Sequence, residues 1–455
     1  MRASVSELGV IGGVSSCDCD GGSHQLKPSS GTNGRVLLKK SFNGDSPTYT
    51  IRNTIEQEIH NHVSELIDLS LYIYSNPELL YQEFKAHAKL SEFLSNRGFK
   101  VENYANIPTA FRVSYTHGEG GRTFGLNSEY DALPGVGHAC GHNLIAVSGV
   151  AGLLSMKAAM QAYDIPGTVV LLGTPAEEGG GGKIKLLDAG AYKDLDACMM
   201  LHPGPGSYGP GGIGPSLARQ RITIDFHGKP AHAAASPWEG VNALDAAVGA
   251  YVGIATLRQQ LQPTTRLHSV ISEGGGQAVN VIPAHAQMQC AVRAQTSGAV
   301  EATVTKIMNC VEGAARMAGC TVKFDFSEMY KDLVNVKGLA HEYASTMNDM
   351  YGYEIRTIFD SAQGIGASTD FGNVTYALPA CHPGFGIPCP PKGGCHTPEF
   401  AGAASTPEAF AETWKASAAM AWCGVRFLMD DAFAAKVRND FEDDQNRIAQ
   451  AVKEL

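Results

Sequence analysis

The chain has 455 residues, of which 44% are hydrophobic and 18% charged, and its formal net charge is -10 at pH 7. One core rarely organises a chain of this length, so we expect two or three domains, and two is the simplest count. The acidic balance argues against a nucleic-acid partner, whose phosphates need a basic surface. No apolar run approaches the roughly 18 residues that cross a bilayer, so we expect small-molecule partners and no membrane.

Residues 1–53 form the first segment, and they predict a flexible leader because they are rich in Gly, Ser, Asp and Lys and lack periodicity. The N-terminus has no basic region followed by a compact apolar run, which argues against secretion. Eleven cysteines are an odd number, and several stand in apolar runs, such as Cys198, Cys290 and Cys423. Buried thiols in a reducing compartment fit better than disulfides, so we expect a cytoplasmic protein.

A catalytic domain of the α/β class is expected over 54–217 and 333–455. Helical periodicity over 54–76 and 85–97 leads to a strand at 99–104. Three apolar strands then begin near Arg122, Thr168 and Ala197, and helices over 143–163 and 183–192 separate them. Short apolar strands that alternate with helices predict a mostly parallel sheet buried on both faces. After residue 333 we expect helices over 340–352 and 407–431.

Between these two parts, residues 218–332 have a different pattern. An alternating strand at 219–228 and a helix over 242–261 are followed by strands at 266–276 and 285–295. A helix over 300–319 and a strand at 321–328 complete the order β-α-β-β-α-β. This order is typical of the ferredoxin-like arrangement, so we expect a self-contained α+β domain inserted into the catalytic domain.

Each of the three apolar strands ends in candidate metal ligands or bases. The first precedes Cys140 and His142, the second precedes Glu177 and Glu178, and the third precedes His202. Ligands of open parallel sheets gather beyond the carboxyl ends of the strands, so three loops are expected to meet in one crevice. Thiolate and imidazole suit zinc, and of two adjacent carboxylates one can bind metal while the other acts as general base.

Every one of these motifs also has a structural explanation. Cys140 and His142 fit a buried thiol beside a helix-capping imidazole equally well, and Glu177 with Glu178 fits a solvated acidic turn. A single His202 is more often a polar cap than a ligand. A Gly- and Pro-rich loop near the C-terminus holds His382 and His396, and at least one of them is expected to reach the crevice.

Taken together, the motifs resemble the aminoacylase and glutamate-carboxypeptidase type of co-catalytic zinc metallopeptidases. Within it the likeness is to the amidohydrolase branch, with auxin-conjugate hydrolases, aminobenzoyl-glutamate hydrolases and β-alanyl-lysine or Xaa-Arg dipeptidases. The segments that carry the likeness are NPELLYQEF (76–84), EYDALPGVGHACGHNL (129–144), TPAEEGGGGK (174–183), LHPG (201–204), GKPAHAAASPWEGVNALDA (228–246), GQAVNVIP (276–283), ASTDFGNV (367–374) and HTPEF (396–400). They span nearly everything after residue 54.

The resemblance implies a zinc-peptidase-like catalytic domain with an inserted lid and dimerisation domain, and hence a homodimer. It also implies two divalent metal ions, zinc before manganese or cobalt. The implied metal ligands are Cys140, His142, Glu178, His202 and His396. Cysteine stands where the carboxypeptidase branch has a bridging aspartate, which favours the amidohydrolase branch.

The remaining roles also follow from the resemblance. Glu177 would be the general base, and Asp131 the carboxylate that orients a ligand. His232 would stabilise the oxyanion, often across a dimer interface, and Asn280 and Arg293 would bind substrate. Structural explanations remain for His232 as a surface turn residue, Asn280 as a turn cap and Arg293 as an exposed strand charge.

His382 fits either substrate binding or closure of its own loop. The leader and the Pro-, Gly- and Cys-rich loop 383–395 are not accounted for by the resemblance, which leaves the substrate range open.

The expected activity is hydrolysis of the amide bond of a dipeptide or N-acyl amino acid through a metal-bound hydroxide. Two alternatives stay open from the sequence. The same site can catalyse ATP-independent amide-bond formation, or the chain can be an inactive metal-binding scaffold. Intact Glu177 disfavours the scaffold, and the sequence identifies neither the acyl group nor the amine.

Overall fold

The computed structural model describes residues 47–206, 211–276, 278–360 and 366–453. Most of the predicted leader lies outside these residues. Residues 47–53 are described, and they form the first turns of helix α1 (Pro47–Ser75), where Ile51 is buried. The helix therefore begins seven residues before the predicted position, because its apolar periodicity extends back to Ile51.

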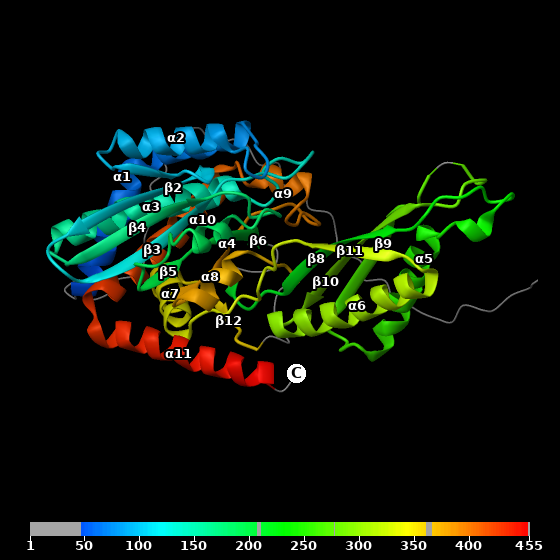
Figure 1. The fold of residues 1–455 in the computed structure, drawn as a ribbon. Coiled ribbons are helices and arrows are strands. Elements are labelled where there is room, and N and C mark those ends of the chain that lie inside the picture. The colour runs from blue at the N-terminus through cyan, green and yellow to red at the C-terminus, as the bar shows by residue number, and fades with distance from the viewer. Residues whose placement is uncertain (1–46, 207–210, 277, 361–365, 454–455) are drawn as a thin grey trace, which may run out of the picture. The chain divides into compact units, whose positions relative to one another are not determined.

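A six-stranded sheet organises the predicted catalytic domain (Figure 1). Its strands are β1 (Val101–Tyr104), β2 (Ile107–His117), β3 (Arg122–Glu129), β4 (Gly167–Thr174), β5 (Ala197–Met199) and β13 (Ala380–Cys381). Their order is β1-β2-β4-β3-β5-β13; the pairs from β4 to β13 are parallel, and β2 is antiparallel to both of its neighbours. The predicted mostly parallel sheet is therefore confirmed.

Helices cover both faces of this sheet. They are α1, α2 (Phe84–Ser95), α3 (His142–Ala162), α4 (Gly182–Asp188), α7 (Lys337–Tyr351), α8 (Phe371–Ala377), α9 (Pro398–Ala403), α10 (Pro407–Met429) and α11 (Asp431–Lys453). Side chains alternate along a strand, so Val169 and Leu171 pack with α1, α3 and α10, whereas Val170 and Leu172 pack with α4 and α8. Burial of both faces explains the continuous apolar run of β4.

The third predicted apolar strand is divided in two. After β5 the chain leaves the main sheet, and β6 (His202–Pro205) pairs with β14 (Gly384–Ile387) in a separate parallel ribbon. A second small ribbon joins β7 (Gly212–Ile213) to β12 (Arg356–Thr357). The first ribbon pairs residue 384 with His202, one of the predicted metal ligands.

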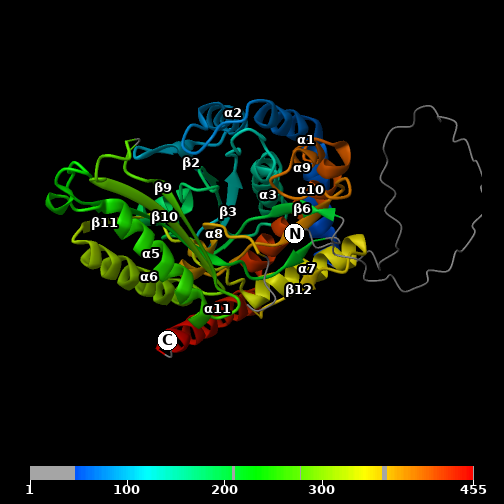
Figure 2. The same cartoon turned by 90° about the vertical axis from the view of Figure 1, so that its right-hand side faces the viewer.

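The residues predicted to form the inserted domain build a four-stranded antiparallel sheet (Figure 2). Its elements are β8 (Ala218–His227), α5 (Ala243–Leu257), β9 (Arg266–Glu273), β10 (His285–Ala294), α6 (Ser297–Ala318) and β11 (Thr321–Phe326), with short 3-10 turns at Pro237–Glu239 and Arg258–Gln260. The order β11-β8-β10-β9 is the ferredoxin-like order. Ile222, Ile224 and Phe226 alternate toward one face, where α5 and α6 complete a separate core.

Helix α3 corrects one expectation from composition. Among the described residues it is the one helix long and apolar enough to cross a membrane, although no apolar run of that length was expected. It is 89% buried over its most apolar window, because it packs between the main sheet and helices α1 and α10. A buried core helix has this composition too.

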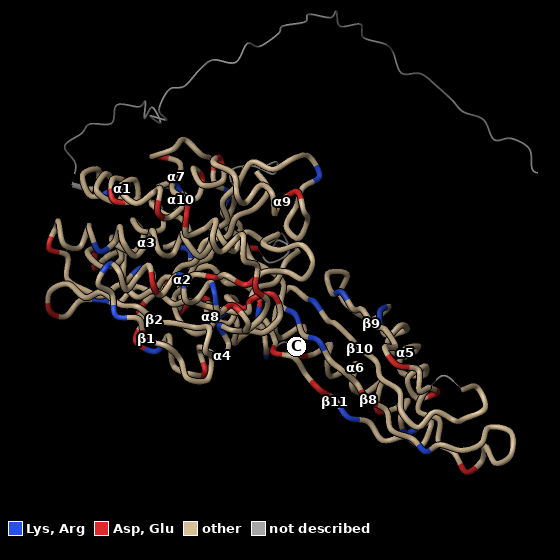
Figure 3. The backbone as a smooth tube through the Cα atoms, turned by 90° about the horizontal axis from the view of Figure 1, so that it is seen from above, with Lys and Arg blue, Asp and Glu red and all other residues tan. Residues whose placement is uncertain are grey.

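The charged residues are spread along the chain. Figure 3 shows Lys and Arg scattered among Asp and Glu along the described backbone.

Candidate metal centre

Parallel strands bring the candidate ligands to one edge of the main sheet. Strand β3 lies between β4 and β5 and is parallel to both, so the carboxyl ends of all three strands meet. Glu129 is the last residue of β3, and Thr174 is the last residue of β4. The loops that follow these strands therefore converge where β5 leads into His202.

The five predicted metal ligands lie together at this edge. Their ligand atoms fall into overlapping groups within 4.8 Å, namely Cys140 with His142 and His202, and Cys140 with Glu178 and His396. The Cys140 Sγ is 3.5 Å from His202 Nε2, and Glu178 Oε1 is 3.5 Å from His396 Nε2 and 3.8 Å from His142 Nε2. Zinc ligands at about 2.0 to 2.3 Å in tetrahedral geometry are separated by about the same distances.

Unpaired buried atoms test whether these residues fit a metal. His142 Nε2, Glu178 Oε1 and Glu129 Oε2 are buried and have no hydrogen-bond partner. Such atoms are costly in a folded protein unless a ligand satisfies them. Burial opposes protonation of His142, but the charges of Asp131, Glu129 and Glu178 outweigh it and raise the pKa of that imidazole. The cluster therefore favours a positive charge at its centre, and its donor set fits divalent metal ions.

The Cys140-Gly141-His142 turn depends on its glycine. Gly141 has φ 76°, in the left-handed region, and a Cβ atom there would lie 2.6 Å from Pro203 Cγ. Only glycine satisfies both conditions without strain. Because Gly141 caps helix α3, His142 is the first helical residue, and the turn directs the thiol and the imidazole to the same cluster.

Asp131 lies directly behind two of the candidate ligands. Its Oδ1 is 3.0 Å from His142 Nδ1, and its Oδ2 accepts a hydrogen bond from the backbone N–H of Glu178 at 3.0 Å. The contact with Nδ1 leaves Nε2 of His142 to face the cluster. Burial opposes ionisation of Asp131, but His142 and the Glu178 amide outweigh it and lower the pKa of this carboxyl.

Two histidines are held by backbone carbonyls. The Nδ1 of His202 donates to Pro203 O at 2.7 Å, and the Nδ1 of His382 donates to Met200 O at 3.0 Å, so the Nε2 of each neutral ring is unprotonated. Their ring centroids are 5.7 Å apart. Burial, with the charge of His202, lowers the pKa of His382 to about 3, so that this ring is neutral. His382 thus lies beside the cluster with an acceptor nitrogen.

His396 comes from the loop after β14, far along the chain. Its backbone N–H donates to Ala139 O at 2.7 Å, which ties this loop to the Cys140 turn. His396 has φ 72°, a conformation that is rare without glycine and common where function constrains the backbone. Its side chain is 55% exposed, so it forms the open side of the cluster.

Glu177 lies inside the cluster within metal-ligand reach of both His142 and Glu178. Its loop is constrained on two sides: Ala176 has φ 59° and donates its N–H to Glu83 Oε1, and the Tyr330 hydroxyl donates to Glu177 O at 2.6 Å. Burial, with the negative charges of Glu129 and Glu178, raises the pKa of Glu177 well above its usual value. Bound cations offset this effect by stabilising the carboxylate.

A buried charge network that the sequence did not predict lies behind Glu177. The Lys183 ammonium contacts Glu129 and donates to Asp370 Oδ1 at 2.7 Å, and all three side chains are fully buried. Burial opposes the charge of Lys183, but Asp370 and Glu129 outweigh it and raise its pKa. These residues stand within segments that carried the resemblance, but nothing near any of them in the sequence indicated that the three would meet.

Three predicted residues lie in the four-stranded sheet domain, and they are not all near the cluster. His232 and Asn280 are exposed on adjacent loops, joined by a hydrogen bond from Ala233 N to Asn280 O, and no described contact links them to the metal ligands. Arg293 is half-buried and donates to Ser368 Oγ at 3.1 Å. The structure therefore brings together Glu177, Asp131, His382 and the five candidate ligands within one chain.

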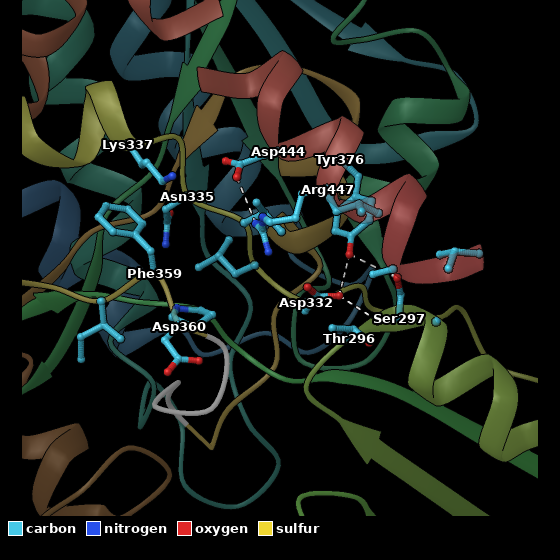
Figure 4. A pocket seen from close by; sticks show the side chains of 18 residues that line it. Thr296, Ser297, Asp332, Asn335, Lys337, Phe359, Asp360, Tyr376, Asp444 and Arg447 are labelled. Carbon is cyan, nitrogen blue, oxygen red and sulfur yellow. Dashed lines mark hydrogen bonds and ion pairs between the residues drawn. The ribbon is translucent and has the colours of Figure 1, made fainter. Parts of the chain in front are cut away.

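A cavity of about 410 Å³ lies apart from this cluster (Figure 4). It is lined by the start of α6, by residues 332–337 and by α11. In it Tyr376 donates to Asp332 Oδ1 at 2.7 Å, and Arg447 donates to Asp444 Oδ1 at 3.0 Å. These four side chains are paired with each other, whereas His142 Nε2 and Glu178 Oε1 at the strand ends have no hydrogen-bond partner, so the chemistry is assigned to the strand ends.

The fold and the ligand cluster together define a metal-dependent hydrolase. Residues 125–401 match the model of peptidase family M20/M25/M40. The chain is 37% identical over 404 residues to the Xaa-Arg dipeptidase of Mus musculus, a match that covers 86% of this chain and 92% of the relative. It is 32% identical over 300 residues to one component of the p-aminobenzoyl-glutamate hydrolase of Escherichia coli, or 60% of this chain and 61% of the relative.

Solved structures agree with the fold. A dinuclear metal-binding peptidase of the M20 family from Bacillus subtilis superposes with a TM-score of 0.60 at 20% identity, over 81% of this chain and 99% of the other. An aminobenzoyl-glutamate utilization protein from Klebsiella pneumoniae gives 0.66 at 17% identity, over 83% and 99%. This chain belongs to peptidase family M20/M25/M40. The predicted family and reaction class, metal-dependent hydrolysis of amide bonds, are thereby confirmed.

Proposed function

We propose that this protein hydrolyses dipeptides or N-acyl amino acids with two zinc ions held by Cys140, His142, Glu178, His202 and His396. The observation that carries the proposal is the convergence of the ligand atoms of five side chains, two of which, His142 Nε2 and Glu178 Oε1, are buried without a hydrogen-bond partner. Divalent ions at such a site supply Lewis-acid chemistry, since they acidify water and polarise a carbonyl group.

Glu177 performs the proton transfers in this proposal. Its carboxylate takes a proton from the attacking water and then delivers it to the leaving amine nitrogen. Two features support the assignment. Glu177 lies beside Glu178, and its loop is held in place by hydrogen bonds to Glu83 and from Tyr330. Glu177 needs no other partner because the same carboxyl group accepts and returns the proton.

The test is Glu177→Gln, which keeps the shape and removes the base. We expect hydrolysis of a dipeptide and N-acyl amino-acid panel to fall by about 10² to 10⁴-fold, the range of general-base contributions, with metal content unchanged. Glu328→Gln is a matched control, because Glu328 is an exposed carboxylate whose side chain lies next to Gly181 in the same loop. Unchanged turnover in metal-loaded Glu177→Gln would disprove the role.

A substrate with a free carboxylate is proposed because of nearby positive charge as well as because of the relatives, which are named as a dipeptidase and an aminobenzoyl-glutamate hydrolase. Arg293 pairs with Arg219 across β10 and β8, and burial, with the nearby Arg219 and Arg221, lowers its pKa. Such a group of arginines suits a substrate carboxylate. Arg293→Lys is expected to raise KM for substrates with a free carboxylate more than for their amides. Equal KM changes for both would exclude this contact.

Zinc is proposed because a thiolate and imidazoles are among the ligands. Metal analysis of purified protein is expected to give about two zinc ions per chain, since two overlapping donor groups share Cys140. Removal with a chelator should abolish turnover, and zinc should restore it at least as well as manganese or cobalt. Greater recovery with manganese would contradict zinc as the resident metal.

The homodimer is proposed to form through the four-stranded sheet domain. Strand β9 is an edge strand on which Val270 is 57% exposed, and helix α5 exposes Val248, Tyr251 and Val252. Unpaired strand edges and exposed apolar side chains are typical of association surfaces. Val252→Asp with Val270→Lys should yield monomers in sedimentation experiments, whereas exposed Met429→Lys should not. Monomeric unsubstituted protein would exclude the dimer.

A cytoplasmic location is proposed as well. All nine cysteines in the described ranges are free thiols, and thiols persist in reducing compartments. Fractionation of cells that produce the full chain tests the location, and recovery in a secreted fraction would contradict it.

A further inference from the structure

The cavity in Figure 4 is lined by a cationic side chain that has no partner among the described residues. Its volume of about 410 Å³ lies within the range of small-molecule pockets, roughly 300 to 1,000 Å³. Lys337 is the first residue of α7, and its exposed ammonium makes no hydrogen bond or ion pair with any residue in the described ranges. The positive end of the helix dipole adds to this charge. The cavity therefore suits an anionic group such as a carboxylate.

Asp332 brings a charge of opposite sign to the same cavity. Its side chain is buried, and Oδ1 accepts hydrogen bonds from Ser297 N at 2.8 Å and from the Tyr376 hydroxyl at 2.7 Å. Neither of these bonds uses Oδ2. Burial raises the pKa of this carboxyl, although the two donors lower it. A cation beside Oδ2 would stabilise the ionised form, so the cavity also suits an ammonium group.

The rest of the lining selects among ligands that carry both charges. Phe359, Ile448 and Val452 contribute apolar surface to the cavity. A free amino acid with an apolar side chain combines a carboxylate, an ammonium and an apolar group in a molecule of suitable size. Hydrolysis of a dipeptide or of an N-acyl amino acid releases such a molecule, because cleavage converts the amide nitrogen into an ammonium beside the free carboxylate.

One wall of the cavity also supports a residue beside the candidate metal ligands. Asn335 lines the cavity, and its Nδ2 donates to Gly214 O at 2.9 Å, while its Oδ1 accepts a hydrogen bond from His382 N at 2.7 Å. The ring centroid of His382 is 5.7 Å from that of His202. Figure 4 shows Lys337 and Asn335 on the same side of the cavity. A carboxylate bound to Lys337 competes with Gly214 for Asn335 Nδ2, which weakens the support of His382.

We propose that this cavity binds a free amino acid with an apolar side chain, and that its occupancy slows hydrolysis through Asn335 and His382. The carboxylate of the ligand pairs with Lys337, and its ammonium pairs with Asp332. The inference rests on the proposed function for the source of the ligand, which is a product of the reaction. The coupling is reciprocal, so a change at His382 that accompanies hydrolysis also changes the affinity of the cavity.

Equilibrium dialysis of the metal-free full chain against radiolabelled L-leucine tests the binding. We expect saturation at about one leucine per chain, since the cavity holds one such set of partners. Isocaproate lacks the ammonium of leucine, and isoamylamine lacks its carboxylate. Each should bind about 10-fold more weakly or worse, because each loses a hydrogen bond to a charged group.

Two pairs of variants locate the bound leucine. Lys337→Gln removes the proposed partner of the carboxylate, and exposed Lys193→Gln is its control. Ala451→Trp fills the cavity from an exposed position on α11, and Ala449→Trp makes the same change on that helix outside the lining. Binding should weaken about 10-fold or more in Lys337→Gln, disappear in Ala451→Trp and persist in both controls. Unaltered binding in Lys337→Gln or Ala451→Trp, no binding to the unsubstituted chain, or equal binding of either leucine analogue would overturn the site.

Steady-state kinetics of the zinc-loaded chain test the regulation, with a dipeptide substrate that contains no leucine. Leucine should lower kcat with little change in KM for the unsubstituted chain and for Ala449→Trp, but not for Ala451→Trp. No fall in kcat, a fall that persists in Ala451→Trp, or a rise in KM alone would overturn the regulation. A chain that binds leucine in the cavity but hydrolyses no amide would overturn the proposed function and leave the binding site in place, so the two proposals fail separately.

Discussion

Glu83 lies under the Glu177 loop, and its ionisation is unfavourable there. Its side chain is buried, Oε1 accepts hydrogen bonds from Tyr81 N and Ala176 N, and Oε2 has no partner. Burial, with the charge of Asp131, raises the pKa of Glu83 to about 7 from its usual 4.5. The protonated form thus contributes stability that is complete below pH 4.5 and is lost as the pH rises through 7.

Glu83→Gln fixes the neutral form and tests this pH dependence. Between pH 5 and 8 the metal-free variant should lose less free energy of unfolding than the unsubstituted chain, by at most about 3 kcal/mol. Urea unfolding at several pH values measures the difference. Exposed Glu354→Gln is the control, and parallel pH profiles for both variants would show that Glu83 is ionised throughout.

Asp131 is expected to control metal affinity rather than the fold. Asp131 orients His142 through its Nδ1 and also accepts a hydrogen bond from the backbone N–H of Glu178. Asp131→Asn therefore weakens the hydrogen bonds that hold two candidate ligands in place. We expect zinc affinity to fall by about 10- to 100-fold, as is usual when a ligand loses its hydrogen-bond partner. Competition with a chromogenic chelator measures it. Asp196→Asn, at the opposite end of β3, should leave the affinity unchanged.

At the level of the elements, one carboxylate joins three helices. Glu342 on α7 accepts from Trp422 Nε1 at 2.6 Å and from Arg426, both on α10, and lies 3.6 Å from Arg52 of α1. Glu342→Ala removes the acceptor of the Trp422 indole and the carboxylate that both arginines approach, and it should lower the free energy of unfolding by about 2 to 3 kcal/mol. Glu412→Ala, which breaks a partly exposed pair with Lys415, should cost less than about 1 kcal/mol. Equal losses would contradict the network.

The elements that the sequence predicted well are those with continuous or strongly periodic apolar patterns, such as β3, β4 and α6. Strand β2 was not predicted, because Pro108 interrupts its start and polar residues fill its far end. Helix α11 was also missed: Phe433, Ala434 and Val437 are its only buried apolar residues, too few for a clear periodicity. The division between β5 and β6 depends on pairing with β14, which is distant in sequence.

Local sequence offered Cys140, His142, Glu178 and His202 as candidate ligands because they follow the predicted strands, and the family resemblance added His396. It did not identify Glu83, Lys183 or Asp370, whose roles arise from partners 50 to 190 residues away. Such contacts follow from the topology of the sheet and its loops, and no pattern of neighbouring residues encodes them.

For the whole molecule, the proposed dimer makes a distinctive prediction. If His232 serves the site of a second copy, Glu177→Gln and His232→Ala chains are each inactive alone but complement each other. Mixed after dissociation and reassociation, they should regain about a quarter of full activity, because half of random dimers are mixed and each has one complete site. Mixtures as inactive as their components would show that His232 acts in its own chain or not at all.

The late position of His396 has a consequence for biosynthesis. Cys140, His142, Glu178 and His202 are made early, whereas His396 follows roughly 200 residues later, which at ribosomal rates corresponds to about 10 to 40 s. During that interval the nascent chain exposes a thiol and two imidazoles without the loop that encloses them. A cell must therefore supply the metal ions after His396 has been made, or protect the half-built centre from metals that bind incomplete sites.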